Sequence, residues 1–137
     1  MRILALDPGT KRVGVAISDE TRTLATPLEF IPAEPFADFL ARLKTLIRER
    51  EVGLILVGVP RNMDGSYGPA AAQAQQFVAV LKEAIPVPIQ TVDERLSTVQ
   101  AQRLLRAAGK RARKQKTRID QSAAAVLLQS YLDTLGH

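Results

Sequence analysis

Apolar and polar positions near the amino end of the chain follow the pattern of short strands separated by turns. Apolar runs bounded by turn residues predict strands over Arg2–Asp7, Arg12–Ser18 and Thr23–Ile31. The segments between these runs are short, so we expect the three strands to form an antiparallel meander.

The middle of the chain switches between helical and strand patterns. Apolar side chains recur at helical spacing over Phe36–Arg50, which predicts an amphipathic helix. The next run, Val52–Pro60, is apolar throughout and is typical of a strand buried on both faces. After a polar, glycine-rich loop, a second helix is expected over Pro69–Ile85 and a fifth strand over Val87–Val92.

The last third of the chain is predicted to be helical. Ser97 and Gln100 have the spacing of a capping box, which predicts a helix over Ser97–Ala108. A final helix is expected over Ile119–Leu135. Right-handed crossovers would place the fourth and fifth strands parallel to the first, with helices on both faces of the sheet. The expected fold is therefore α/β, a single domain over residues 1–137 with a mixed five-stranded sheet, the arrangement of the ribonuclease H-like fold.

The composition narrows the possible chemistry. The chain has no cysteine, and its single histidine, His137, is the last residue. Both facts argue against Ser-His-Asp and Cys-His nucleophiles and against thiolate or histidine metal sites. An enzyme of this composition would rely on carboxylates, Lys and Arg, hydroxyl groups or a hard metal ion.

Charge and hydropathy indicate the kind of partner and the compartment. The net charge is +5 and the pI is near 10, which favours polyanionic partners such as nucleic acid, although a merely basic soluble protein has the same balance. The sequence has no apolar stretch of about 18 residues, and its first residues do not have the pattern expected of a signal peptide. We therefore expect no membrane association and a cytoplasmic protein.

Acidic residues end several of the predicted strands. Asp7 ends the first, and Asp93 and Glu94 follow the fifth. Carboxyl ends of parallel strands share one edge of a sheet, so we expect these groups to converge there. Asp120 joins them if it lies on the apolar stripe of the last helix. Two structural alternatives remain: Asp7-Pro8-Gly9 also suits a hairpin turn, and Asp120 also suits a capping box with Thr117.

Clustered carboxylates repel one another unless cations lie between them, and a pair of Mg²⁺ or Mn²⁺ ions would both relieve this repulsion and activate water for phosphoryl transfer. The candidate catalytic residues and metal ligands are Asp7, Glu94 and Asp120, with Asp7 bridging two ions. Asp93 is expected to point to the opposite side of its strand from Glu94, and either to support the metal ligands without binding metal or to have a structural role.

Four segments of the chain resemble the YqgF/RuvX family: LALDPGTKRVGVAISDE, VGVPRNMDGS, TVDERLST and IDQSAAAVLLQSYL. Members of that family are described as Holliday junction resolvases and as nucleases that trim pre-16S rRNA. The resemblance spans nearly the whole chain. It implies a ribonuclease H-like nuclease whose acidic residues fall on Asp7, Glu94 and Asp120, and it leaves the choice between the two substrates open.

Cationic and polar residues around the same edge are candidates for nucleic-acid binding. For each, the alternative is a solvated or locally packed loop residue. Phosphate contacts are expected from the turn after Asp7, from the two loops that follow the fourth and fifth strands, and from the basic run before Asp120. Tyr67 could stack on an unpaired base. The full set is Thr10, Lys11, Arg12, Arg61, Asn62, Tyr67, Arg95, Lys110, Arg111, Arg113, Lys114 and Lys116.

Other functions compete with the metal-dependent endonuclease. The segment Asp7–Thr10 also resembles the phosphate loop of actin-like sugar kinases, but those enzymes need two such lobes and this chain has the length of one. A noncatalytic nucleic-acid-binding factor in transcription or ribosome biogenesis is the main alternative. Symmetric cutting of a junction would require a homodimer, whereas trimming one RNA end would not.

Overall fold

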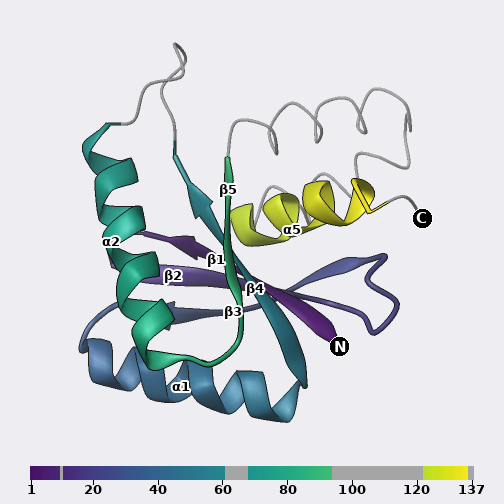
Figure 1. Cartoon of the computed structure of the whole chain (residues 1–137), viewed down its shortest axis with the longest axis horizontal. Helices are drawn as coiled ribbons and strands as arrows, with labels where there is room; N and C mark the ends of the chain where they lie inside the picture. The colour runs from purple at the N-terminus through teal and green to yellow at the C-terminus, as the bar shows by residue number, and fades with distance from the viewer. Residues whose placement is uncertain (10, 61–67, 94–121, 136–137) are drawn as a thin grey trace.

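The computed structural model describes residues 1–9, 11–60, 68–93 and 122–135 of the chain (Figure 1). The elements in these ranges are β1 (Arg2–Pro8), β2 (Arg12–Ser18), β3 (Ala25–Pro32), α1 (Phe36–Glu49), β4 (Val52–Val59), α2 (Pro69–Ala84), β5 (Ile89–Asp93) and α5 (Ala123–Asp133). None of the described helices is long and apolar enough to cross a membrane.

The strands form one five-stranded sheet in the order β3-β2-β1-β4-β5. β1 pairs antiparallel with β2, and β2 pairs antiparallel with β3. β4 lies parallel to β1, and β5 lies parallel to β4. The predicted meander and the two parallel crossover strands are therefore confirmed, and β1 lies at the centre of the sheet.

β3 begins later than the sequence pattern predicts, at Ala25 instead of Thr23. The cause is Asp19 in the preceding turn. One of its carboxylate oxygens accepts hydrogen bonds from the backbone N–H groups of Thr23 at 2.8 Å and of Leu24 at 3.2 Å. These bonds hold both residues in the turn and away from the ladder with β2.

β3 is also an edge strand with an irregular ladder. The pairing of β3 with β2 shifts register between Val15 and Ala16. Pro27 and Pro32 lie within β3 and have no backbone N–H to donate. Glu29 of this strand binds Arg42 of α1 through two hydrogen bonds, of 2.6 and 3.0 Å, which fastens the edge to the helix beneath it.

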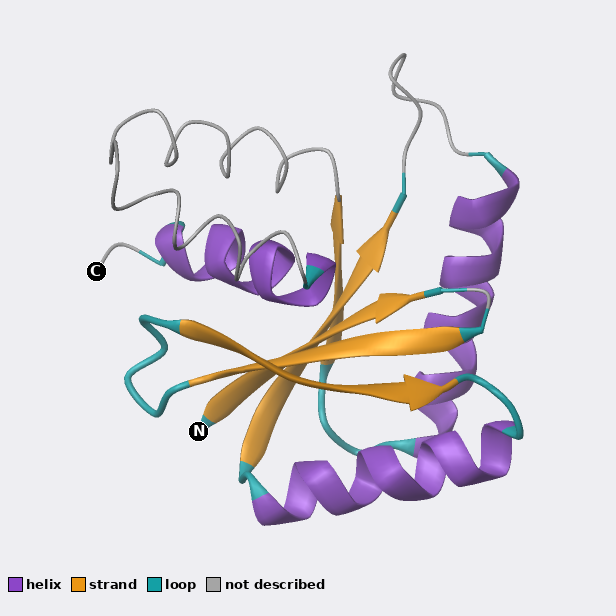
Figure 2. Cartoon of the chain, turned by 180° about the vertical axis from the view of Figure 1, so that it is seen from behind, coloured by secondary structure: helices purple, strands orange, loops and turns teal. Residues whose placement is uncertain are grey.

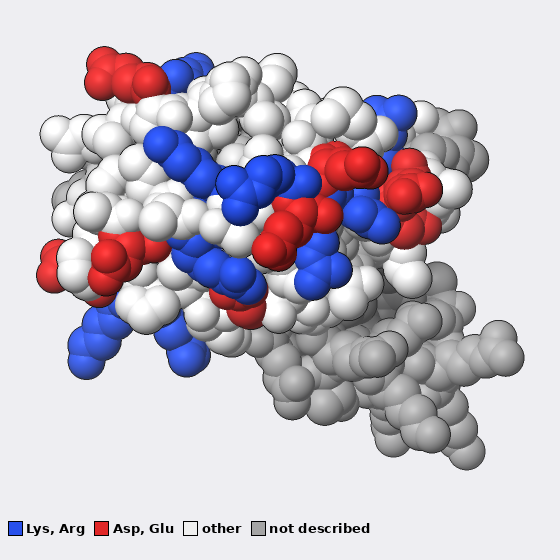
Figure 3. All heavy atoms as spheres, turned by 90° about the horizontal axis from the view of Figure 1, so that it is seen from below, with Lys and Arg blue, Asp and Glu red and all other residues white. Residues whose placement is uncertain are grey.

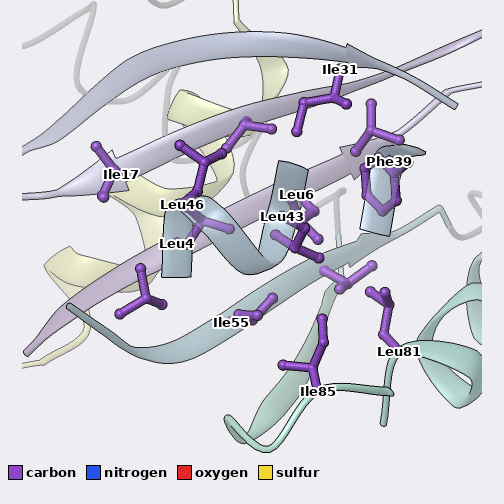
Figure 4. Close-up of a cluster of buried hydrophobic side chains, with 14 of the residues drawn as sticks. Leu4, Leu6, Ile17, Ile31, Phe39, Leu43, Leu46, Ile55, Leu81 and Ile85 are labelled. Carbon is purple, nitrogen blue, oxygen red and sulfur yellow. The ribbon is translucent and has the colours of Figure 1, made fainter. Parts of the chain in front are cut away.

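Alternation along the strands gives the sheet two buried faces (Figure 2). α1 and α2 cover one face, where Phe39 and Leu81 are fully buried. Figure 4 shows this core, in which side chains of the strands meet those of α1. The other face is covered by α5. The buried residues there are Ile3, Ala5, Ala16, Leu56, Ala124, Ala125, Leu127, Leu128 and Leu132. Helices on both faces were predicted and are confirmed.

α5 corrects one prediction. It begins at Ala123 and not at Ile119, because the backbone of Ser122 is extended and its hydroxyl accepts a hydrogen bond from the N–H of Ala125 at 3.1 Å. Ser122 is therefore the N-cap, and the predicted start of this helix at Ile119 is wrong. Asp120 itself lies outside the described residues.

Several predicted features lie outside the described residues. They are the glycine-rich loop over 61–67, the helix expected over Ser97–Ala108 and the basic run over 110–118. The other predicted helices are confirmed to within a residue at their ends, since α1 ends at Glu49 and α2 ends at Ala84.

Candidate functional site

Asp7 lies near the carboxyl end of the central strand and is half-buried. The ladder holds its backbone from both sides, because Asp7 pairs with Gly14 of β2 and the preceding Leu6 pairs with Val57 of β4. By alternation its side chain belongs to the α5 face of the sheet, with those of Ile3 and Ala5. A carboxylate is thus held on the central strand of the sheet.

The turn after Asp7 is tight. The N–H of Gly9 donates to the carbonyl of Arg12 at 3.0 Å, and a Cβ atom at Gly9 would lie 2.6 Å from that same oxygen. Glycine is therefore required here by the close approach of backbone. Lys11 lies exposed in the turn, and its carbonyl accepts a bond from the N–H of Ala33, which ties the turn to the end of β3.

The hairpin-turn interpretation of Asp7 is correct for the backbone but does not account for the side chain. Within the described residues, no hydrogen bond or ion pair engages the Asp7 carboxylate. A turn residue of this type usually accepts bonds from the following N–H groups. The carboxylate of Asp7 is therefore left available for another partner.

The amino end of α5 lies beside Asp7. A Cβ atom on Gly14, the cross-strand partner of Asp7, would lie 3.8 Å from Cβ of Ala124 in the first turn of the helix. Farther along α5, Gln129 accepts a hydrogen bond from the N–H of Ala25 and donates one to the carbonyl of Thr23. These two contacts fix the direction of α5, whose partly positive amino end points to the edge that carries Asp7.

Arg12 and Phe30 lie on the same face of the sheet as Asp7. The guanidinium carbon of Arg12 lies 4.1 Å from the centroid of the Phe30 ring, which is a cation–π contact. Phe30 pairs with Gly14 across β2 and β3 and is 48% exposed. The sequence analysis did not single out Phe30. The alternation of side chains along the strand could have predicted the face on which Phe30 lies. It could not have predicted the exposure of Phe30, which depends on how far α5 extends over the sheet.

Asp93 ends β5 and pairs with Val59 of β4. Val59 packs against α2, so Asp93 belongs to the face opposite that of Asp7. The two carboxylates therefore do not form one site. The orientation agrees with the expectation that Asp93 points away from the site, and its role stays a prediction.

Three of the predicted site residues are described, namely Asp7, Lys11 and Arg12. Among the described residues there is no group of three or more acidic or histidine side chains able to hold a metal ion. The remaining candidates lie outside the described residues: Thr10, Arg61, Asn62, Tyr67, Glu94, Arg95, Lys110, Arg111, Arg113, Lys114, Lys116 and Asp120.

The face of the molecule around α1 carries charges of both signs. Figure 3 shows Lys and Arg side chains interspersed with Asp and Glu on this face. In α1 itself, three basic residues lie between acidic residues near its two ends; in chain order they are Asp38, Arg42, Lys44, Arg48 and Glu49. A polyanion would meet attraction and repulsion there in similar measure. The excess positive charge of the chain is thus not gathered on the α1 face.

Comparison with known proteins gives consistent matches over almost the whole chain. The family model described as "RuvX: Holliday junction resolvase" matches residues 1–134. A protein of Roseiflexus sp. (strain RS-1) named "Putative pre-16S rRNA nuclease" is 46% identical over 97% of this chain and 94% of its own length. One of the same name from Thermoanaerobacter pseudethanolicus is 48% identical over 98% of this chain and 97% of its own length.

Solved structures agree on the fold. Thermus thermophilus RuvC superposes with a TM-score of 0.58 at 16% identity, covering 99% of this chain and 97% of RuvC. The fowlpox virus Holliday junction resolvase has a TM-score of 0.52 at 15% identity, covering 98% of this chain and all of the viral enzyme. At such identities the likeness concerns the fold alone. It confirms the α/β, ribonuclease H-like architecture that the order of elements predicts.

Proposed function

Because the chain belongs to the RuvX family, we propose that it is a metal-dependent endonuclease that hydrolyses phosphodiester bonds in structured nucleic acid. The observation that carries this proposal is Asp7, a half-buried carboxylate on the central strand with no described partner. Buried carboxylates are normally paired or bound to metal, so an available one at the carboxyl edge of a parallel pair points to a cation.

The metal site would combine Asp7 with Glu94 and Asp120. Glu94 follows Asp93 directly in the sequence. Because side chains alternate along a strand and Asp93 belongs to the other face, the pattern favours the face of Asp7 for the Glu94 side chain. Asp120 precedes the cap of α5, and the first turn of that helix lies beside the partner of Asp7. All three donors are hard oxygens, which suit Mg²⁺ or Mn²⁺. Bound ions, of which we propose two, would activate water and stabilise the charge that develops on the phosphate.

Cationic residues after the turn at Gly9, together with the amino end of α5, would position the scissile phosphate. Lys11 and Arg12 follow the turn at Gly9 and are exposed, so their charges are available to the nucleic-acid backbone. The amino end of α5 adds a favourable field for the same anion. Asp7 itself pairs with β2, and the preceding Leu6 pairs with β4, so the ligand would be carried by a hydrogen-bonded strand, which suits a fixed reaction geometry.

The 5′ end of pre-16S rRNA is the substrate we favour, since the curated relatives carry the name of a nuclease for that precursor. Such an enzyme would act in the cytoplasm, and cleavage of one RNA end would not require a homodimer. Holliday junction resolution is the second candidate, favoured by the family description. A homodimer in solution would support it, because two symmetric cuts require two active sites.

The deciding experiment measures cleavage of a pre-16S rRNA fragment and of a four-way junction by the purified protein in Mg²⁺ or Mn²⁺. We expect Asp7→Asn to lower the rate by about 100-fold or more, because it removes a metal ligand without changing its shape. Asp38→Asn, at an exposed position of α1, serves as the control and should cleave normally.

Glu94→Gln and Asp120→Asn should behave like Asp7→Asn in the same assay. Replacing Mg²⁺ with Ca²⁺ should retain binding and lose most turnover, because Ca²⁺ coordinates more loosely. Full cleavage by a folded Asp7→Asn variant would refute the site. Binding without any cleavage by the wild-type protein would favour the noncatalytic factor.

A further inference from the structure

Phe30 is a large aromatic residue of β3 that stays half-exposed although one side of its ring lies over the sheet. It is one of the large apolar side chains that the described part of the chain leaves in solvent, with 48% of its surface accessible. Among the described residues, no other large apolar side chain that is exposed belongs to β3. A single exposed aromatic side chain offers little of the continuous apolar area that a protein interface requires.

The surroundings of Phe30 hold its ring in place over the sheet. Its cross-strand partner is Gly14, where a Cβ atom would lie 3.3 Å from Cε1 of the ring. The missing side chain at Gly14 therefore creates the space that the ring uses. Gly14 pairs on its other side with Asp7, so the ring lies two strands away from the proposed metal ligand and on the same face.

Arg12 completes the arrangement. It lies on the same face as Asp7, within the reach of a long side chain across the β1–β2 pair. No ion pair joins the two among the described residues; the guanidinium group lies over the Phe30 ring instead, 4.1 Å from its centroid. This contact leaves the Asp7 carboxylate available for metal, and the N–H donors of Arg12 make no ion pair with another described residue.

We propose that Phe30 and Arg12 form a stacking platform for an unpaired nucleobase of the substrate, next to the phosphate that is cleaved. This inference rests on the proposed nuclease function. Aromatic rings and guanidinium planes both stack on bases, and such stacking tolerates any sequence because every base has a π-face. A base inside a duplex is already stacked on both sides. The platform therefore selects a nucleotide at a single-stranded end or a branch point.

The chain contains no tryptophan, so Phe30→Trp introduces a single fluorophore at the platform. We would titrate this variant in Ca²⁺ with a single-stranded RNA, a single-stranded DNA and a blunt duplex of the same sequence. Both single strands should quench the emission, and the duplex should quench it much less. Val80→Trp, on α2 and 44% exposed, is the matched control and should not respond. Equal quenching at both positions, or none at position 30, would overturn the proposal.

A second measurement separates stacking from chemistry. Phe30→Leu should weaken binding of the single strand by about 5- to 100-fold, the range for one base on one aromatic ring, and Phe30→Tyr should restore it. For Phe30→Leu, the cleavage rate at saturating substrate should change less than threefold, so the loss of binding appears as a higher KM. Its thermal unfolding temperature should be similar to that of Phe30→Tyr. Unchanged affinity in a cleaving Phe30→Leu protein would refute the platform alone. If single strands quench the Phe30→Trp variant as expected but the wild-type protein cleaves no substrate, the nuclease proposal alone is refuted.

Discussion

At the scale of single residues, two glycines frame Asp7 and tolerate a side chain differently. A Cβ atom at Gly9 would collide with the backbone oxygen of Arg12 at 2.6 Å, and backbone held in a turn cannot move aside. We expect Gly9→Ala to lower the free energy of unfolding by about 1–3 kcal/mol, the usual cost of overpacking. Urea denaturation measures this loss.

Gly14→Ala is the matching variant, and the expected result is different. The added methyl group would meet the ring of Phe30 at 3.3 Å, but that ring is half exposed and can shift. Alanine also restricts the unfolded chain, which favours folding by about 0.4–1 kcal/mol. The free energy of unfolding should therefore change by less than about 1 kcal/mol. A larger loss at Gly14 than at Gly9 would show that Phe30 is fixed more rigidly than its exposure suggests.

Asp19 gives a prediction about pH. Hydrogen bonds from the N–H of Thr23, the hydroxyl of Thr21 and the N–H of Leu24 lower the pKa of Asp19 below its ordinary value of 3.8. A depressed pKa stabilises the folded state above pH 3.8, and this stabilisation is lost as the pH falls through the folded-state pKa. Asp19→Ala should therefore be less stable than wild type at pH 7, and the gap should narrow below pH 3.8.

Thermal unfolding between pH 7 and pH 2 would measure that gap, with Glu20→Ala as a control for losing one acidic charge in the same turn. A gap of constant size across this range would mean that the ionised form of Asp19 contributes nothing to the turn.

At the scale of elements, α5 depends on Gln129 for its position. The side chain of Gln129 bonds both the N–H of Ala25 at 2.9 Å and the carbonyl of Thr23 at 3.0 Å. We expect Gln129→Ala to cost about 1–3 kcal/mol of unfolding free energy, because it leaves a partly buried backbone N–H without its partner. It should also slow cleavage, since the amino end of α5 lies beside the partner of Asp7.

Denaturation and cleavage assays on the same preparation would measure both effects. Gln75→Ala, at an exposed position of α2, should change neither stability nor cleavage. Stability equal to wild type in Gln129→Ala would show that hydrophobic packing alone positions α5.

The elements themselves were largely predictable from the sequence, because their signals are local. Alternation and turn residues predicted the strands, and apolar spacing predicted α1 and α2. The start of α5 was not predictable, because Thr117 and Ser122 are both residue types that N-caps favour. Only the folded backbone shows that Ser122 is the N-cap. The exposure of Phe30 was not predictable either, because it depends on where a helix distant in sequence ends.

At the scale of the whole molecule, the excess positive charge should act on nucleic acid through the segment before Asp120. The α1 face carries charges of both signs (Figure 3), whereas the sequence over 110–118 carries six basic residues in nine and no acidic one. Each cation that meets a phosphate releases about one counterion, so affinity falls steeply with salt. Alanine at four of these positions should reduce the slope of log affinity against log salt by about three to four units for duplex contacts. The four positions are Arg111, Arg113, Lys114 and Lys116.

The control removes the same charge from the side of the sheet that α1 and α2 cover, at exposed positions of these helices and at the residue after α1. These positions are Lys44, Arg48, Arg50 and Lys82. Its salt slope should stay close to that of wild type. Equal slopes in the two quadruple variants would mean that net charge, and not a local contact, governs binding.

The whole site was less predictable than the fold, because a site requires side chains from separate segments to meet. The sequence identified Asp7 as an unusual strand end. The structure places its backbone in β1 and shows no hydrogen bond or ion pair from its carboxylate to another described residue. The sequence also indicated that Asp93 and Glu94 face opposite ways, and the position of Asp93 agrees. The meeting of Asp7, Glu94 and Asp120 stays a prediction for the cleavage assays.

The irregular edge at β3 has a consequence for self-association. Open sheet edges invite a second chain to add its own strand and extend the sheet, the route by which many β-proteins aggregate. At β3 an incoming strand would find two proline nitrogens that cannot donate, at Pro27 and Pro32, and a ladder already out of register. Continuous pairing through this edge is therefore blocked. If two copies of the chain act together on a branched substrate, they must meet through other surfaces, and fibril growth from this edge is suppressed by the same two residues.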